Sequence, residues 1–151
     1  MRPMADDLDI SCANLQAQPV DEQRLMNAVR AVLHSAHVVR GEISLTIVND
    51  ARMQELNREH LEHDYPTDVL SFLLDHSYDR LDGEIIVSAD YAAAEAAHYG
   101  WEMENELLLY VVHGALHLIG YDDTTPEAAA HMRAQERLQL ATFGLSPPGR
   151  D

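Results

Sequence analysis

The sequence predicts an α+β domain with α/β-like character, in which helices pack on a small, mixed, four-stranded sheet. Segments with alternating apolar residues, typical of strands, are interspersed with segments whose apolar residues recur at helical spacing. No apolar run reaches the roughly 18 residues of a membrane span, so we expect no membrane association. With 151 residues, 46% of them hydrophobic and 24% charged, the chain can bury the core of one domain.

Strand and helix signals alternate through the first half of the chain. Apolar and polar residues alternate at 8–12, which is a weak strand signal, and at 43–47, which is a stronger one. Between them, residues 25–33 carry apolar side chains at helical spacing. Asn49 and Asp50 are both placed to cap a short helix after the second strand. Because a helix separates these two strands, we expect them to be parallel.

Two further strands and an alanine-rich helix follow. Residues 69–74 are predicted as a short, well-buried strand and 83–88 as its antiparallel partner, joined by a polar loop at 75–82. Residues 89–98 favour a helix that Gly100 can end.

Two longer helices complete the chain. A helix is predicted from near Trp101 to Ile119, ending before Gly120, and its apolar residues between 107 and 119 predict that it is buried. Thr125 begins the last helix, with a proline in a permitted early position. We find no repeat and no internal linker, so 1–151 should form a single domain with a loose C-terminal tail at 145–151.

The charge of the chain is strongly negative. Ten basic residues, all arginine, stand against 26 acidic residues and give a net charge of −16. Nucleic-acid binders normally present a basic face, which this chain cannot have over a large area. We therefore expect no strong unaided nucleic-acid binding, and any RNA function must depend on a local cleft, a metal ion or a partner protein.

The cysteine content and the N-terminal sequence suggest a compartment. Cys12 is the only cysteine, so no internal disulfide can form, and we expect it to be a small, buried strand residue rather than a reactive thiol. The N-terminal residues lack the apolar stretch of a secretory signal. Together these features predict a cytoplasmic protein.

The most informative segment reads HGALHLIGYDD and begins at His113. His113 and His117 lie four residues apart, on one face of the predicted helix, where two imidazoles can share a metal ion. The glycine after the helix lets the chain turn back, so that Asp123 can be the third ligand. Asp122 is then expected to hold a ligand imidazole or the turn. Three protein ligands leave one position for water, as in catalytic zinc sites.

A histidine pair at this spacing is by itself more often structural than metal-binding. Here the buried helix favours a metal, because two imidazoles in an apolar core are costly unless something satisfies them. Gly114, beside the first histidine, lets a neighbouring strand or a substrate come close. It also argues against peptide hydrolysis, because zinc peptidases of the HExxH type have a glutamate there as general base.

Three blocks of sequence carry a family resemblance. The segment HGALHLIGYD is similar to the motif HGxLHLxGYDH, residues 56–72 contain L-N followed by PTDVLSF, and residues 83–85 read GEI, similar to GDI. On these blocks the chain resembles the YbeY family of bacterial endoribonucleases, a family of metalloproteins that mature ribosomal RNA. The resemblance covers most of the chain, from about Ile43 to Leu138.

The resemblance implies both an activity and its setting. The activity would be metal-dependent, single-strand-specific cleavage of RNA in the maturation of small-subunit (16S) ribosomal RNA and in ribosome quality control. The cofactor would be one zinc ion per chain. The partners would be ribosomal RNA, small-subunit ribosomal proteins and ribosome-associated GTPases.

The chain departs from the family pattern at two positions. The third ligand is typically histidine, and the aspartate at 123 would make the site harder and tilt it toward Mn or Mg. Where many relatives carry an arginine, this chain has Leu61. Arg58, His60 and His63 lie nearby and are the candidate catalytic residues, although each one taken alone fits a solvated loop residue better.

Two other functions remain open. One is a ribosome-assembly factor with a structural metal and little or no nuclease activity, and the other is a metal-dependent hydrolase of another substrate. The sequence assigns no general base: Asp122, His60 and His63 are the candidates. It also leaves open whether water or the RNA 2′-hydroxyl attacks phosphorus.

Overall fold

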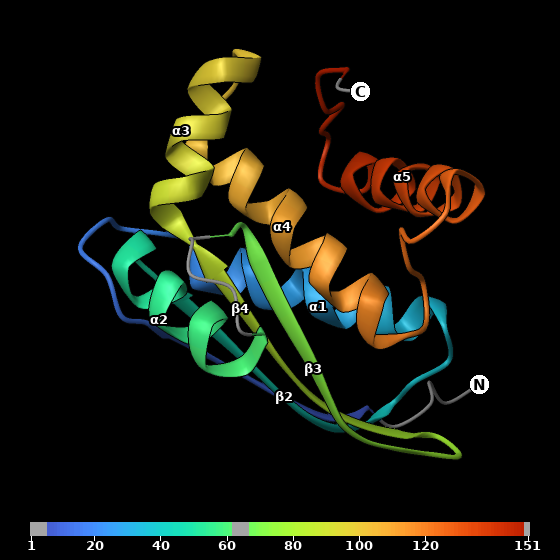
Figure 1. Cartoon of the computed structure of the whole chain (residues 1–151). Helices are drawn as coiled ribbons and strands as arrows, with labels where there is room; N and C mark the ends of the chain where they lie inside the picture. Colours follow the sequence, from blue (N-terminus) through green and yellow to red (C-terminus); the bar gives the residue numbers. More distant parts are fainter. Residues whose placement is uncertain (1–5, 62–66, 150–151) are drawn as a thin grey trace.

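The structure, a computed structural model, describes residues 6–61 and 67–149. Its elements are, in chain order, β1 (Asp7–Asn14), α1 (Glu22–Ser35), β2 (Arg40–Val48), α2 (Asp50–Leu61), β3 (Val69–Ser77), β4 (Arg80–Ser88), α3 (Ala89–Tyr99), α4 (Met103–Leu118) and α5 (Pro126–Ala141). The sheet has the order β1-β2-β4-β3, with β1, β2 and β4 parallel and β3 antiparallel to β4. The predicted α+β class, the mixed four-stranded sheet and both predicted strand pairings are therefore confirmed (Figure 1).

The sheet separates two apolar clusters. Leu45 and Ile85, which are neighbours in the parallel register, join a large core with the buried faces of α1 and α4. Their sequence neighbours point the other way, and Val48 and Ile86 pack with Met53 of α2. The helices therefore lie on both sides of the sheet, with α3 and α5 packed against α4 (Figure 1). This arrangement follows from the alternation of side chains along a strand.

The predicted strand at 69–74 is confirmed as part of β3, but the prediction that it is well buried is wrong. Within that segment only Leu70 is buried, and Leu73 and Leu74 are 51% and 66% exposed. The reason is that β3 lies at the edge of the sheet, so its apolar run is covered over only part of its length. Composition alone does not distinguish an edge strand from a central one.

The prediction of a loop at 75–82 is also wrong. Both strands continue through this segment, and the paired residues Asp75 and Asp82, followed by Ser77 and Arg80, extend the hairpin to a two-residue turn. A bulge between Leu73 and Asp75 interrupts the register. The polar residues that suggested a loop lie on a solvated part of the hairpin, where strand pairing already satisfies the backbone.

Local signals set the ends of the helices. The Asn49 side chain accepts a hydrogen bond from Arg52 N at 2.9 Å, and the Thr125 hydroxyl accepts one from Ala128 N at 3.0 Å. Both cap backbone N–H groups that have no partner within the helix.

Among the described residues, no helix combines the length and the apolar character that a membrane crossing needs.

Cys12 and the C-terminal segment complete the comparison with the sequence. Cys12 lies half buried on β1, and burial, with the nearby Glu22 carboxylate, raises the pKa of its thiol to about 12. The raised pKa favours the protonated, less reactive thiol, as expected, although Cys12 is less buried than the sequence predicted. Residues 145–149 contain neither helix nor strand, and Leu145 packs against the core. The single domain with a loose tail stays a prediction.

Helix α4 is the centre of the fold, and Gly114 sets how closely it approaches the sheet. A Cβ atom at Gly114 would lie 2.9 Å from both Ile85 Cγ2 and Ser71 Oγ, and 3.1 Å from Val69 Cγ2. The Ser71 hydroxyl donates a hydrogen bond to the Gly114 carbonyl at 3.0 Å. The missing side chain therefore brings helix and strands into direct contact, as the sequence predicted.

We predict that Gly114→Val lowers the free energy of unfolding by about 2–3 kcal/mol, since the added methyl groups must displace packed strand side chains. Chemical denaturation followed by circular dichroism measures the change. Gly149→Val is the matched control, because a Cβ there meets nothing within 4 Å, and it should stay within about 0.5 kcal/mol of the parent. Equal stability of the two variants would contradict a packing role for Gly114.

Candidate metal centre

The two histidines interrupt an otherwise buried stretch of α4. Every residue from Glu106 to Leu118 is buried except His113 and His117, which are partly exposed. Their four-residue spacing places them one above the other on the face of the helix that opens to solvent. The sequence therefore aims both imidazoles out of an apolar core toward a single point.

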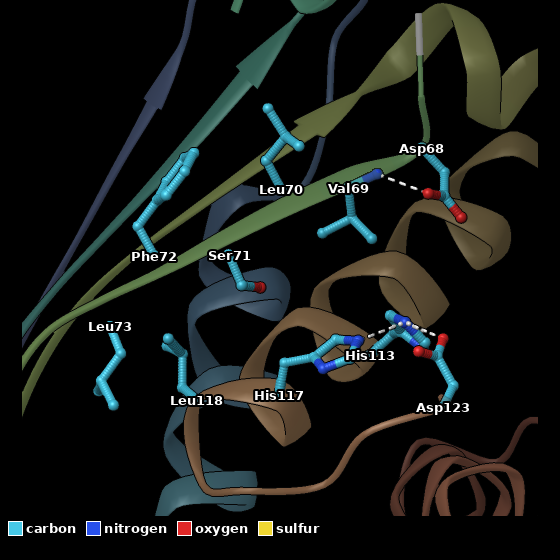
Figure 2. A pocket seen from close by; sticks show the side chains of 10 residues that line it. All are labelled: Asp68, Val69, Leu70, Ser71, Phe72, Leu73, His113, His117, Leu118 and Asp123. Atoms are coloured by element: carbon cyan, nitrogen blue, oxygen red, sulfur yellow. Dashed lines mark hydrogen bonds and ion pairs between the residues drawn. The ribbon is translucent and has the colours of Figure 1, made fainter. Parts of the chain in front are cut away.

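The imidazoles and one carboxylate converge. The Nε2 atoms of His113 and His117 lie 3.1 Å apart, and Asp123 Oδ2 lies 3.7 Å from His113 Nε2 (Figure 2). One ligand atom from each of the three residues lies within 4.8 Å of the others. The structure thus brings the three predicted metal ligands together.

A tight turn delivers Asp123 to this point. Gly120 has φ +106°, a left-handed conformation that glycine adopts without strain, and Tyr121 N donates to Leu116 O at 3.0 Å. Asp122 Oδ1 accepts hydrogen bonds from Thr124 N at 3.2 Å and from the Thr124 hydroxyl at 3.0 Å. Of the two roles expected for Asp122, the structure places it in the one that holds the turn.

Glu136 on α5 holds His113 from behind. Its Oε2 atom lies 3.1 Å from His113 Nδ1, and both side chains are mostly buried. A carboxylate that accepts the Nδ1 proton leaves the Nε2 lone pair facing the converging ligands, and such partners are typical of metal-bound histidines. Sequence reasoning missed this residue. Its spacing could have revealed it: Glu136 lies four residues from both Met132 and Leu140, the buried residues of α5, and so on the face of α5 that packs against the protein.

The two imidazoles differ in their electrostatic surroundings. Burial by itself would lower the pKa of His113, but the hydrogen bond and charge of Glu136, with the charges of Asp68 and Asp123, outweigh it and raise that pKa. The pKa of His117 is lowered, first by burial and then by repulsion from His113. His117 is therefore the more readily available neutral ligand.

The cluster forms one wall of an open pocket of about 480 Å³. The opposite wall is the edge strand β3 with the residue before it, and the lining residues are Asp68, Val69, Leu70, Ser71, Phe72, Leu73, His113, His117, Leu118 and Asp123 (Figure 2). The Asp68 carboxylate accepts a hydrogen bond from Val69 N at 2.8 Å and sits at the rim. It is a second acidic residue that sequence reasoning missed, although it lies inside the PTDVLSF block.

The predicted catalytic residues on α2 lie outside this lining. Arg58 and His60 are exposed on the last turns of α2, and neither is among the residues that line the described pocket. The His60 ring packs at a tilt of 56° against the ring of Phe72, a pocket-lining residue, with ring centroids 5.2 Å apart. His63 and the side chain of Leu61 lie outside the described residues. A catalytic role for Arg58, His60 or His63 stays a prediction.

The donor set fits a divalent metal ion. Ligands bound about 2.0–2.1 Å from a tetrahedral zinc ion lie about 3.4 Å from one another, close to the measured separations of 3.1 and 3.7 Å. Two imidazoles and a carboxylate are ligand types that zinc accepts. The Asp123 side chain is 51% exposed, so the cluster remains open on its solvent side. The three residues could therefore hold a metal ion and leave room for a further ligand.

Comparison with known proteins places the chain among curated relatives of similar length. Residues 11–144 match the family described as Endoribonuclease YbeY. An "Endoribonuclease YbeY" from Moorella thermoacetica is 41% identical over 155 residues, which cover 91% of this chain and 99% of the relative. A protein of the same name from Roseiflexus castenholzii is 40% identical over 152 residues, covering 94% and 96% of the two chains.

A solved structure has the same fold. The solution structure of a Thermotoga maritima protein is similar to this chain with a TM-score of 0.59 and 23% identity, and the match covers 95% of this chain and 99% of the other. At this identity the likeness bears on the fold only, which it supports along almost the whole chain.

We predict that Glu136→Gln lowers the pKa of His113 in chelator-treated protein, because burial then outweighs the weakened partner. The raised pKa stabilises the folded state below the ordinary pKa of histidine, and this contribution is lost as the pH rises through the folded pKa. NMR titration of the histidine rings measures the shift. Glu127→Gln, on the first turn of the same helix, is the control. A His113 titration equal to that of the parent would contradict the assignment.

Proposed function

This chain belongs to the YbeY family of endoribonucleases, and on that premise we propose that it is a metal-dependent, single-strand-specific endoribonuclease. The observation that carries the proposal is the convergence of His113, His117 and Asp123 at the wall of an open pocket. A purely structural metal site is normally closed by four protein ligands. Here three ligand atoms meet beside a 480 Å³ pocket, which suits a site that admits a substrate.

The cofactor we propose is one zinc ion per chain. When bound, it would lower the pKa of a coordinated water and neutralise charge on a phosphate oxygen. Asp123, in place of the histidine typical of the family, adds a negative charge and a harder oxygen ligand. The metal preference should therefore lie closer to Mn or Mg than in a three-histidine site.

The protein residues around the cluster have separate tasks. Glu136 keeps the proton of His113 on Nδ1 and so presents Nε2 to the site. Asp122 fixes the turn that carries Asp123. Asp68 faces the cluster from the rim, where its carboxylate is a candidate proton acceptor or water-orienting group. The apolar side chains of β3 form the wall along which a single strand would lie.

We further propose that the substrate is small-subunit ribosomal RNA, met in the cytoplasm during ribosome maturation and quality control. The net charge of −16 opposes tight binding of free RNA. Delivery by small-subunit ribosomal proteins or ribosome-associated GTPases would overcome that repulsion. The family membership and the charge together support this assignment.

A second candidate is a ribosome-assembly factor whose metal is structural. It is favoured by Leu61, which stands where many relatives carry an arginine. A metal-loaded protein that sediments with ribosomes but leaves single-stranded RNA intact would identify this function. Cleavage of single-stranded RNA would exclude it.

We predict that Asp123→Ala reduces the metal content of the purified protein, because one of three ligands is removed. Elemental analysis after dialysis measures the loss. Asp122→Ala, which removes a neighbouring carboxylate outside the cluster, should retain more metal than Asp123→Ala. Unchanged occupancy in Asp123→Ala would refute the assignment of the third ligand.

We predict that Asp123→His increases cleavage of single-stranded RNA by zinc-loaded protein, because a neutral ligand leaves more positive charge on the metal. The measurement is the cleavage rate at saturating zinc, with double-stranded RNA and a peptide mixture as control substrates. Cleavage by the parent supports the proposed activity. Absence of cleavage by both proteins would overturn it in favour of the assembly factor.

A further inference from the structure

Two arginines of α5 have no partner in the described part of the chain. Of the eight described arginines, six have an interaction within the chain, for example Arg30 with Asp6 and Arg80 with Asp82. Arg133 and Arg137 have no hydrogen bond, ion pair or ring contact within residues 6–61 and 67–149. In a chain with 26 acidic residues, an unpaired pair of cations calls for an explanation.

The two arginines lie together. They are four residues apart on α5, hence on one face of that helix, and both are exposed. Like charges at this spacing repel each other and destabilise a helix unless an anion lies between them. Glu136, the acid within reach on the same helix, is engaged with His113. Among residues 6–61 and 67–149, the pair is thus a charged site without a counter-ion.

The arginines line a hollow of about 170 Å³ between α5 and the chain that follows it. Its lining residues are Leu109, Arg133, Glu136, Arg137, Pro147, Pro148 and Gly149. The C-terminal segment, which leaves the end of α5 in Figure 1, supplies the other lining residues through Pro147, Pro148 and Gly149. The hollow therefore has a basic rim and a partly apolar floor.

This hollow is connected to the metal-binding cluster by shared walls. Leu109 and Glu136 also line a hollow of about 140 Å³, which is bounded by Asp68, Tyr110 and His113. Asp68 and His113 in turn line the 480 Å³ pocket of the cluster. Three adjoining depressions therefore run from the edge strand, past the histidines, to the arginine pair.

We propose that Arg133 and Arg137 bind a backbone phosphate of single-stranded RNA and anchor the strand away from the cleaved bond. The inference rests on the proposed function, since it takes the cluster of His113 as the place of cleavage. An RNA strand that lies at the His113 cluster faces the carboxylates of Asp68, Asp123 and Glu136. A guanidinium pair supplies paired donors that match a phosphate and offsets that repulsion locally.

The test compares two double variants with the same change in net charge. Arg133→Gln/Arg137→Gln removes the proposed anchor. Arg52→Gln/Arg80→Gln removes two arginines from surface ion pairs with Glu55 and Asp82 and serves as the control. The probe is a fluorescent single-stranded RNA dodecamer of mixed sequence, and its binding to chelator-treated protein is followed by fluorescence anisotropy at several salt concentrations.

We expect the anchor variant to bind the dodecamer about 10- to 150-fold more weakly than the parent, the loss typical of charge-assisted hydrogen bonds. Its slope of log K against log salt should be shallower by about 0.7, the value for one phosphate on a single strand. The control variant should change less in both respects.

Cleavage kinetics separate this inference from the proposed function. With metal-loaded protein, the anchor variant should raise KM for the dodecamer and leave kcat nearly unchanged, because the arginines lie away from the reacting bond. Cleavage with equal KM and equal RNA affinity in the parent and the anchor variant would overturn the anchor and leave the proposed function intact. Loss of binding to an acidic peptide with unchanged RNA binding would overturn it in favour of a protein partner.

Discussion

The site depends on the close approach of α4 to the sheet at Gly114. The helix is buried on nearly all sides, so it fits only where a neighbouring element leaves room for it. At Gly114 the strand side chains come so near that a Cβ would overlap them, and the Ser71 hydroxyl reaches the helix carbonyl. This contact fixes the distance between the histidine-bearing face of α4 and the edge strand β3. The pocket between them is the space that remains.

Helix α5 and the turn before it complete the cluster that the histidines of α4 begin. The chain leaves α4 through a glycine turn that carries Asp123 back to the histidines, and α5 then packs against α4 with Glu136 facing His113. The same short stretch of chain therefore supplies a candidate ligand and the group that orients another ligand. Because His113 is held from both sides, its ring is constrained before any ion binds. Such preorganisation favours metal binding, since less freedom is lost on association.

The electrostatics of the site are unusual for an enzyme of RNA. Carboxylates surround the imidazoles and raise the pKa of His113, and the chain as a whole is acidic. A bound cation would reverse the local sign of the field and make the pocket receptive to phosphate. Under the two proposals, a bound metal ion and the two arginines of α5 would have complementary tasks. The ion would supply positive charge at the bond to be cleaved, and the arginines would hold the RNA strand at a distance from it.

The sequence by itself determined the fold class, both strand pairings and the three residues that converge. These follow from patterns that are local in the chain, namely the strand and helix periods, the four-residue histidine spacing and the glycine exit to Asp123. The tertiary structure decided which strand lies at the edge, how far the hairpin extends, and that Glu136 and Asp68 face the cluster. Edge position and contacts across helices depend on packing between segments that are distant in the chain, and no local pattern encodes that packing.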